Sequence, residues 1–368
     1  MKIDAIDVYY TKNHLIRPWT TAYGSDPDIY SIFVRMISGS DVGWGEASPL
    51  FAPTYSPEWG YGVFRMIKDF LAPSLAGKEF DSPEEINKSM KAIKGNPFAK
   101  SALEIAFWTL KSKKTGVPLH KMLGGQYKEV DVGADFGVQD NLDTLIELID
   151  GAIKRGFPRI KLKAKPGWDL NMLQVIRSHF PTTKFHIDCN SGYTLDDLPL
   201  FKEIDKMNLE MIEQPLMYWD IIDHMKLQRA IETPICLDES ATSPEIVRQA
   251  LEIGACKYIN IKMGRVGGLY HSKMINDMCV DAGAGCWIGG MLETAVGAGI
   301  SVEMATMSAI TYPSDLFPSD NYYVKDIADE KIALSSAGKM MPKNIAGTPY
   351  PPNMNLLRER TLEVAHIE

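Results

Sequence analysis

The sequence lacks any uninterrupted apolar run of about 18 residues, the length that a helix needs to cross a bilayer. We therefore expect no association with a membrane. The chain opens on Lys2 to Tyr9, which alternates polar and apolar residues as a half-buried strand does, with no leader segment before it. Together these absences predict a cytoplasmic protein.

Clusters of basic residues are also missing. Lys and Arg number 39 against 47 Asp and Glu, which gives a formal net charge of −8. Since binding to phosphates requires clustered Lys and Arg, we expect no nucleic-acid partner. Cysteine is scarce too, with 5 residues, an odd number, and no CxxC spacing. We expect these cysteines to be buried free thiols.

The composition that is present is that of an ordinary globular protein, with 45% hydrophobic and 23% charged residues. The 368 residues suit a barrel of about 250 residues plus a smaller domain. Strand patterns at 30–37 and 43–47 precede a helix capped by Ser82 and a second helix over 100–114. This order predicts an α+β domain at 1–125, ending at the Gly124–Gly125 pair.

Beyond that pair, short apolar strands alternate with helical stretches, the pattern of parallel βα units. Seven strand candidates lie at 130–138, 159–164, 184–190, 209–215, 234–240, 258–264 and 283–290. An eighth, poorly marked strand near 308–312 would close a barrel. The predicted fold is therefore α/β, a (β/α)8-type barrel at 126–324, with a C-terminal segment at 325–368 that packs back on the first domain and completes it.

A charged residue stands near the C-terminal end of most central strands, at an almost constant spacing. The steps from Lys163 through Asp188, Glu213 and Asp238 to Lys262 are 25, 25, 25 and 24 residues. One such step is one βα unit, so these side chains should ring the same mouth of the barrel. In barrels of this type, that C-terminal mouth is where active sites are found.

The three carboxylates Asp188, Glu213 and Asp238 each interrupt an apolar strand. Converging like charges repel one another, and a hard divalent cation is the simplest remedy. Oxygen ligands favour Mg²⁺, or Mn²⁺, over Zn²⁺. The alternative is that each carboxylate merely caps the helix that follows its strand.

Lys161 and Lys163 flank Leu162, so on an extended strand both should project into the barrel. A buried, crowded ammonium has a lowered pKa, which makes lysine a usable base, and Lys161 could supply that crowding for Lys163. Lys262 would lie across the barrel and place a lysine on each face of a bound substrate. The alternative for any single lysine is a solvated strand end.

These residues and their surroundings resemble the enolase superfamily, specifically its o-succinylbenzoate synthase / N-acylamino acid racemase branch, in the muconate-lactonizing-enzyme subgroup. The resemblance covers essentially the whole chain and rests on the order of short motifs at 55–58, 102–108, 160–163, 188–190, 212–215, 234–240, 260–262, 264–268 and 289–294. It implies a capping domain, a homo-oligomer and a small carboxylate substrate. It also implies that Lys163 is the acid/base, that Lys262 is its partner, and that Asn190 and Glu239 orient the ligands and Lys262.

The same resemblance implies a substrate pocket with a selecting loop at 17–25, which contains Trp19 and Tyr23, and small residues that receive an acyl or succinyl arm. The further residues of this predicted pocket are Tyr55, Gly289, Gly290, Met291 and Glu293. Asp135 departs from the pattern, because family members tend to carry a small or neutral residue there. If it faces the substrate, it would repel an anionic succinyl arm or attract an amine.

The reaction class predicted from the residues is removal of the proton next to a substrate carboxylate, through an enediolate that Mg²⁺ stabilises. The leading reaction is that of o-succinylbenzoate synthase, a dehydration in menaquinone biosynthesis. A racemase of N-acylamino or N-succinylamino acids needs the same residues, and another cycloisomerase or epimerase of the superfamily remains open. A non-catalytic barrel that only binds a ligand is the alternative from a different class.

Overall fold

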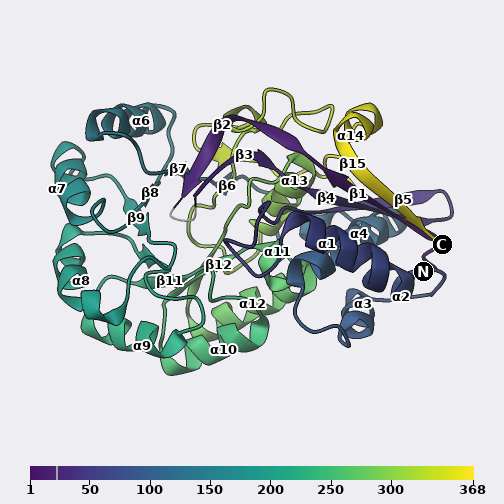
Figure 1. Cartoon of the computed structure of the whole chain (residues 1–368), viewed down its shortest axis with the longest axis horizontal. Coiled ribbons are helices and arrows are strands. Elements are labelled where there is room, and N and C mark those ends of the chain that lie inside the picture. The colour runs from purple at the N-terminus through teal and green to yellow at the C-terminus, as the bar shows by residue number, and fades with distance from the viewer. Residues whose placement is uncertain (22–23) are drawn as a thin grey trace.

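The computed structural model describes residues 1–21 and 24–368, which form two parts lying side by side (Figure 1). One part is a barrel ringed by helices, and the other is an antiparallel sheet with helices against it. The N- and C-termini lie together at the outer end of this sheet. Among the described residues, none of the helices could span a membrane.

The antiparallel sheet joins the two ends of the chain. Its strands follow the order β15 (Thr361–Ile367), β1 (Ala5–Thr11), β4 (Ile32–Ser38) and β5 (Asp41–Ala47). The C-terminal strand β15 thus completes the sheet, as expected. Strand β1 is buried along its whole length rather than half-buried as predicted. The reason is that both sheet faces are covered, one by the helices that follow β5 and the other by α14 (Met354–Arg360).

The helices of this part follow β5 in the chain. They are α1 (Gly60–Met66), which continues through a π-helical turn at Ile67–Leu71 into α2 (Ala72–Leu75), then α3 (Pro83–Met90), α4 (Pro97–Thr115) and α5 (Leu119–Met122). Ser82 caps α3 as predicted, accepting a 3.2 Å hydrogen bond from the Glu85 amide. Helix α4 starts three residues before the predicted 100. It packs directly on β5, since a side chain at Gly43 or Gly45 would collide with α4 backbone.

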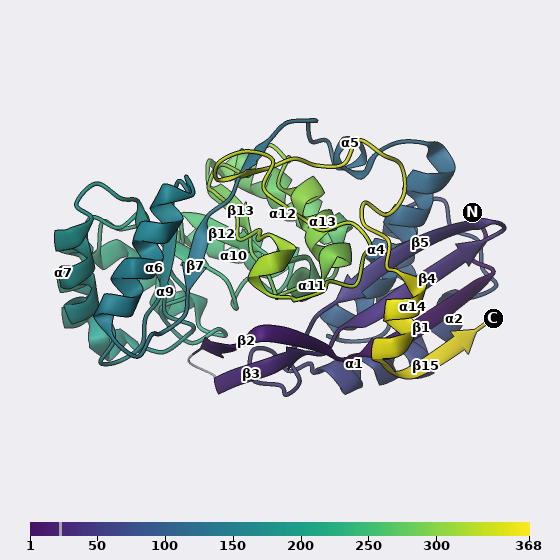
Figure 2. The same ribbon diagram turned by 90° about the horizontal axis from the view of Figure 1, so that it is seen from above.

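Residues 17–21 and 24–25 do not form the loop that we predicted, and residues 22 and 23 of that segment lie outside the described residues. The described residues belong to β2 (Asn13–Thr21) and β3 (Gly24–Ile29), which pair antiparallel from Asn13 opposite Ile29 to Thr21 opposite Gly24 and are called the β2–β3 hairpin below. Of the residues in β2 and β3, only Asn13 and Ile29 are buried, so the hairpin has no apolar alternation by which sequence patterns identify strands. Figure 2 shows the hairpin leaving the sheet and running along the barrel.

The barrel strands run parallel in chain order and are shorter than predicted. They are β7 (Ala134–Phe136), β8 (Ile160–Lys163), β9 (Phe185–Asp188), β10 (Ile212–Glu213), β11 (Ile235–Leu237), β12 (Tyr258–Ile261) and β13 (Gly285–Ile288). Around them lie α6 (Leu142–Lys154), α7 (Leu170–His179), α8 (Leu198–Ile204), α9 (Ile221–Ala230), α10 (Pro244–Ile253), α11 (Met263–Val266), α12 (Leu269–Ala282) and α13 (Ala295–Met304). Short pairs and turns complete the list: β6 (Val130–Asp131) with β14 (Lys339–Met340), and 3-10 turns at Leu195–Asp197, Asp205–Met207 and Ser319–Asn321.

The eighth place in the barrel is filled without a regular strand, which corrects the prediction at 308–312. Every residue of this segment is described, yet it makes only isolated parallel bridges, from Ile310 to Cys286 and from Ser314 to Val132. These bridges still join the segment to both neighbours, because Asp315 N donates to Ile288 O at 2.8 Å and Gly133 N to Ser314 O at 2.9 Å. Pro313 lacks an amide hydrogen and interrupts any continuous ladder here.

Two buried glutamates of the sheet part reach into the barrel part at helix N-termini. Glu46 of β5 accepts hydrogen bonds from the amides of Thr294 at 3.0 Å and Gly297 at 2.8 Å, at the start of α13. Glu104 of α4 accepts from the amides of Leu269 at 2.7 Å and Tyr270 at 2.9 Å, at the start of α12. Since helix N-termini carry unpaired amides and a partial positive charge, these carboxylates fasten the parts together.

Candidate active site

The charged residues predicted to ring the barrel mouth lie on adjacent strand ends. Lys163 closes β8 and pairs in register with Asp188 at the end of β9, which in turn pairs with Glu213 at the end of β10. Asp238 and Lys262 follow directly after β11 and β12. The spacing of one βα unit therefore gives the predicted arrangement.

The carboxylates Asp188, Glu213 and Asp238 are fully buried, and each offers an oxygen within 4.8 Å of the others. They do not cap the helices that follow their strands. The side chains at those helix N-termini are Asp220 for α9 and Ser243 for α10, while Thr194 closes the turn that leads into α8. This disposes of the alternative that the three acids are helix caps.

The lysines project into the barrel against these acids. Lys163 Nζ lies 2.6 Å from Asp188 Oδ2, and Lys262 Nζ lies 2.9 Å from Asp238 Oδ2, so the two amines stand on different members of the acid group. Lys161 Nζ lies 2.9 Å from both Asp188 and Glu213. The site thus holds an acidic centre flanked by amines.

Lys161, the residue expected to crowd Lys163, has a raised pKa. Burial alone would lower it, but the surrounding carboxylates of Asp188, Glu213 and Asp315 together raise the pKa well above its usual range. The pKa of Lys262 is also raised, against the effect of burial, by Tyr55 and the nearby acids. The Asp188 carboxyl has a lowered pKa, because Lys161 and Lys163 outweigh the cost of its burial.

Asn190 and Glu239 lie beside this centre. The backbone nitrogen of Asn190 donates to Asp188 Oδ1 at 3.0 Å, and its side-chain amide donates to Glu239 Oε1 at 3.0 Å. Tyr55, from the sheet part, closes the same region, since its hydroxyl lies 3.0 Å from Asp238 Oδ1 and its ring lies 4.6 Å from Lys262 Nζ.

Several residues of the centre were not assigned a role from the sequence. Asn260 donates to Glu213 Oε1 at 2.8 Å, and buried Arg265 contacts both Asp238 and the Tyr55 hydroxyl. Asn260 could have been found, because it lies two residues before Lys262 and so faces the same side of β12. Arg265 lies in the short helix α11, whose four residues are too few for a periodic pattern to give its orientation.

Asp315 was also missed. It accepts from Lys161 at 3.2 Å and forms an ion pair with Arg159, whose guanidinium lies 5.2 Å from the centre of the Trp287 ring. His186, below, contacts Glu213 at 3.3 Å, and burial lowers the pKa of its imidazole to about 4. Because Asp315 stands on the irregular eighth segment, strand spacing could not indicate it.

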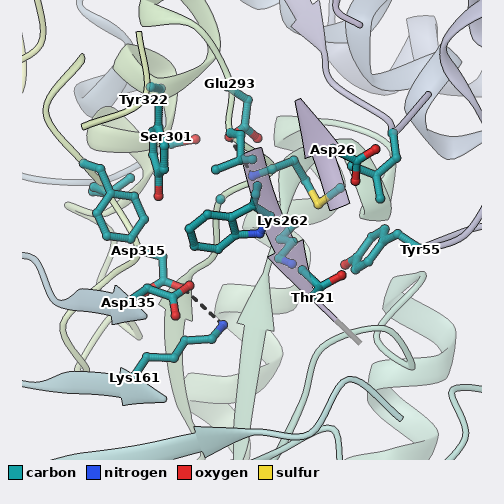
Figure 3. Close-up of a pocket in the computed structure, with 18 of the residues that line it drawn as sticks. Thr21, Asp26, Tyr55, Asp135, Lys161, Lys262, Glu293, Ser301, Asp315 and Tyr322 are labelled. Atoms are coloured by element: carbon teal, nitrogen blue, oxygen red, sulfur yellow. Dashed lines mark hydrogen bonds and ion pairs between the residues drawn. The ribbon is translucent and has the colours of Figure 1, made fainter. Parts of the chain in front are cut away.

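A pocket opens above the acidic centre (Figure 3). Of the predicted substrate residues, those that line it are Trp19, Tyr55, Asp135, Gly290, Met291 and Glu293. Gly289 is buried outside the lining, where a side chain would collide with Asn260, and Tyr23 lies outside the described residues. Thr21, from the predicted selecting segment 17–25, also lines it. The sequence did not indicate the remaining wall, which includes Asp26, Leu50, Leu316, Phe317 and Tyr322. Burial raises the pKa of Glu293 to about 7.

Comparison with known proteins was consistent along the whole chain. Residues 5–124 match the mandelate racemase / muconate lactonizing enzyme N-terminal domain, and residues 144–344 match the enolase C-terminal domain-like family. An o-succinylbenzoate synthase of Geobacillus stearothermophilus is 40% identical, over 90% of this chain and 89% of its own. An N-succinylamino acid racemase of Thermus thermophilus is 35% identical, over 93% and 92%.

The fold agrees with these relatives. A solved member of the enolase superfamily from Listeria innocua superposes with a TM-score of 0.96 at 32% identity, covering 100% of this chain and 99% of that one. Both domain matches and the relatives above point the same way. The chain belongs to the enolase superfamily of enzymes, in the group that contains o-succinylbenzoate synthases and N-succinylamino acid racemases.

Proposed function

We propose that this chain removes the proton next to a substrate carboxylate in a Mg²⁺-dependent reaction, and that its leading reaction is the dehydration carried out by o-succinylbenzoate synthase. The observation that carries the proposal is that Lys163 and Lys262 pair with different carboxylates of the buried acidic centre. Lys163 lies 2.6 Å from Asp188, and Lys262 lies 2.9 Å from Asp238. A substrate α-carbon held between two amines can lose its proton on one face, and the planar enediolate that forms can meet an amine on the other.

The donor set fits a hard divalent ion. Asp188, Glu213 and Asp238 offer only oxygens, all buried and within 4.8 Å of one another, which suits Mg²⁺ and also Mn²⁺. When bound, the ion would neutralise the substrate carboxylate and the negative charge that develops on it. Asn190 and Glu239 would hold the ligands in position through their mutual hydrogen bond of 3.0 Å.

The roles of the lysines follow from their positions. Lys163, in its neutral form, accepts the α-proton as the electron pair moves into the enediolate, and Lys161 supplies positive charge beside it. In a dehydration, the enediolate then expels the β-hydroxyl, which leaves as water with the proton that Lys163 has accepted. In a racemisation, Lys262 delivers a proton to the opposite face. Both outcomes use one catalytic set.

The choice of substrate rests on the relatives. Curated o-succinylbenzoate synthases 33–40% identical to the chain favour dehydration of a succinyl-bearing cyclohexadiene carboxylate, a step of menaquinone biosynthesis. The Thermus thermophilus relative supports racemisation of N-succinylamino acids as the second candidate. Purified protein with Mg²⁺ should be assayed for both reactions. Dehydration without racemisation supports the first, racemisation alone supports the second, and loss of both together with no α-hydrogen exchange in heavy water would contradict the proposal.

A further inference from the structure

The pocket above the acidic centre shares a wall with a second, larger hollow. The inner pocket has a volume of about 80 Å³, whereas the outer hollow has about 690 Å³ and lies between β2, the end of β7 and α6. Four residues line both spaces: Trp19, Asp135, Phe317 and Tyr322. A substrate whose carboxylate is bound at the acidic centre, and which is too long for the inner pocket, would therefore extend past these four side chains into the outer hollow.

Three of these four residues are aromatic and pack edge to face. The Trp19 and Tyr322 rings lie 5.9 Å apart at 85°, and the Phe317 and Tyr322 rings lie 5.3 Å apart, also at 85°. The backbone holds the group together, because Ile16 N of β2 donates to Tyr322 O at 2.7 Å. All three side chains are half-buried, so their surfaces are accessible from the hollow. Aromatic faces attract ammonium and guanidinium groups.

The fourth residue, Asp135, has one carboxylate oxygen without a hydrogen-bond donor among the described residues. This oxygen, Oδ1, is buried. Its neighbour Asp315 is by contrast engaged by Lys161 at 3.2 Å and by Arg159. Figure 3 shows Asp135 and Asp315 next to each other, above Lys161 and below Tyr322.

A buried carboxylate without a donor is costly for the folded protein. Burial raises the pKa of Asp135 to about 6, so above neutral pH the group is ionised and attracts a positive partner. The charges of Lys161 and Lys163 partly offset that burial, but no donor in the described residues makes a hydrogen bond to Oδ1. The open side of the wall faces the path of the substrate.

On the basis of the proposed function, we propose that Asp135, Trp19, Phe317 and Tyr322 form a box for an ammonium or guanidinium group on the arm of the substrate. The same catalytic set would then act on amino-acid derivatives with a cationic arm, in addition to succinyl compounds. An anionic succinyl arm is repelled by Asp135, so its carboxylate would have to lie away from the box. The cation can come from the amino-acid side chain or from an N-aminoacyl group, because both carry the same chemistry.

The test compares α-hydrogen exchange in heavy water, with Mg²⁺, for four compounds that differ in arm charge. N-acetyl-L-norleucine is neutral, N-acetyl-L-lysine carries its ammonium on the side chain, β-alanyl-L-norleucine carries it on the acyl arm, and N-succinyl-L-norleucine carries a carboxylate there. We expect kcat/KM for at least one ammonium compound to exceed that of the neutral compound by about 10-fold or more, as for a hydrogen bond to a charged group. Which of the two is preferred identifies the source of the cation.

Variants separate the box from general effects of charge. Asp135→Asn should bring the ratio of ammonium to neutral compound close to unity and raise kcat/KM for N-succinyl-L-norleucine. Tyr322→Leu should lower the ratio by about 2- to 5-fold, the range expected for one cation–π contact. The matched control is Asp143→Asn, which removes an exposed carboxylate at the start of α6 and should leave all ratios unchanged.

The outcomes distinguish this inference from the proposed function. Exchange of the neutral or succinyl compound without preference for either ammonium compound, or a preference that survives Asp135→Asn, overturns the box and leaves the proposed function standing. Exchange with none of the four compounds, but dehydration of the cyclohexadiene carboxylate, also overturns the box alone. Absence of both exchange and dehydration overturns the two together.

Discussion

The side-chain amide of Asn190 donates a 3.0 Å hydrogen bond to Oε1 of Glu239, which joins the end of β9 to the end of β11. The backbone of Asn190 adopts φ of 43°, a left-handed conformation that asparagine tolerates better than most residues. In this conformation the backbone nitrogen of Asn190 also donates a hydrogen bond to Asp188. Asn190 therefore connects Asp188, a proposed metal ligand, to the segment after β11 that also carries Asp238, another proposed ligand.

We expect Asn190→Ala to weaken Mg²⁺ binding by about 10- to 100-fold, the usual effect of removing a group that orients a ligand. Calorimetric titration of Mg²⁺ measures this directly. The matched control is Asn208→Ala, because Asn208 is exposed and has a similar φ of 53°. It carries the same backbone strain away from the site. Equal losses in both variants would assign the effect to strain.

Lys163→Ala should reduce α-hydrogen exchange by about 10²- to 10⁴-fold, the contribution expected of a positioned base. The fold should persist, because Asp188 keeps Lys161 as a partner at 2.9 Å. Exchange is followed by proton NMR in heavy water, and folding by circular dichroism. Lys165→Ala, which removes an exposed lysine two residues on, should retain full exchange. Near-normal exchange in Lys163→Ala would move the base to another residue.

Mg²⁺ should raise the thermal stability of the protein, and Asp238→Asn should diminish this rise. A ligand bound only by the folded state at 100 times its Kd stabilises by about 2.7 kcal/mol. The variant loses one ligand charge. It also disturbs the contacts of Asp238 with Lys262 and Arg265, so the quantity to compare is the shift in Tm on adding metal, not Tm itself. No shift in the unmodified protein at millimolar Mg²⁺ would instead support a barrel that binds no metal.

Glu104 should make stability depend on pH. Burial raises the pKa of its carboxyl from 4.5 to about 7 in the folded protein, so the folded state binds the proton more tightly than the unfolded state does. The free energy of unfolding should therefore fall as pH rises from about 4.5 to about 7, by at most about 3 kcal/mol for this group. Denaturant unfolding at pH 5 and pH 7.5 should show a smaller decrease for Glu104→Gln. The control Glu84→Gln changes an exposed residue and should behave as the unmodified protein does.

Much of the barrel could be predicted because each βα unit repeats the same pattern of polar and apolar residues. An apolar strand ends in a polar residue at the mouth, and equal spacing from Lys163 to Asp188 to Glu213 becomes direct pairing of adjacent strands. The domain boundaries, the homo-oligomer and the individual residue roles remain predictions. Asp135 was singled out because members of the family that the chain resembles tend to carry a small or neutral residue there, and it lines the pocket.

The parts that sequence patterns did not reveal have little apolar periodicity or no regular ladder. The β2–β3 hairpin is mostly exposed, so its strands are held by backbone pairing rather than by a buried face. Asp315 lies on the irregular eighth segment. Arg265 lies in the four-residue helix α11 and contacts residues distant in the sequence, such as Tyr55. Such contacts depend on the assembled tertiary structure.

The glutamates that cross from the sheet to the barrel limit how the chain can be rearranged. A chimera that took its first domain from a relative without acids in the places of Glu46 and Glu104 would leave the first turns of α13 and α12 with bare amides. If the first domain is replaced in order to change substrate specificity, the incoming domain must therefore carry acids at the positions of Glu46 and Glu104.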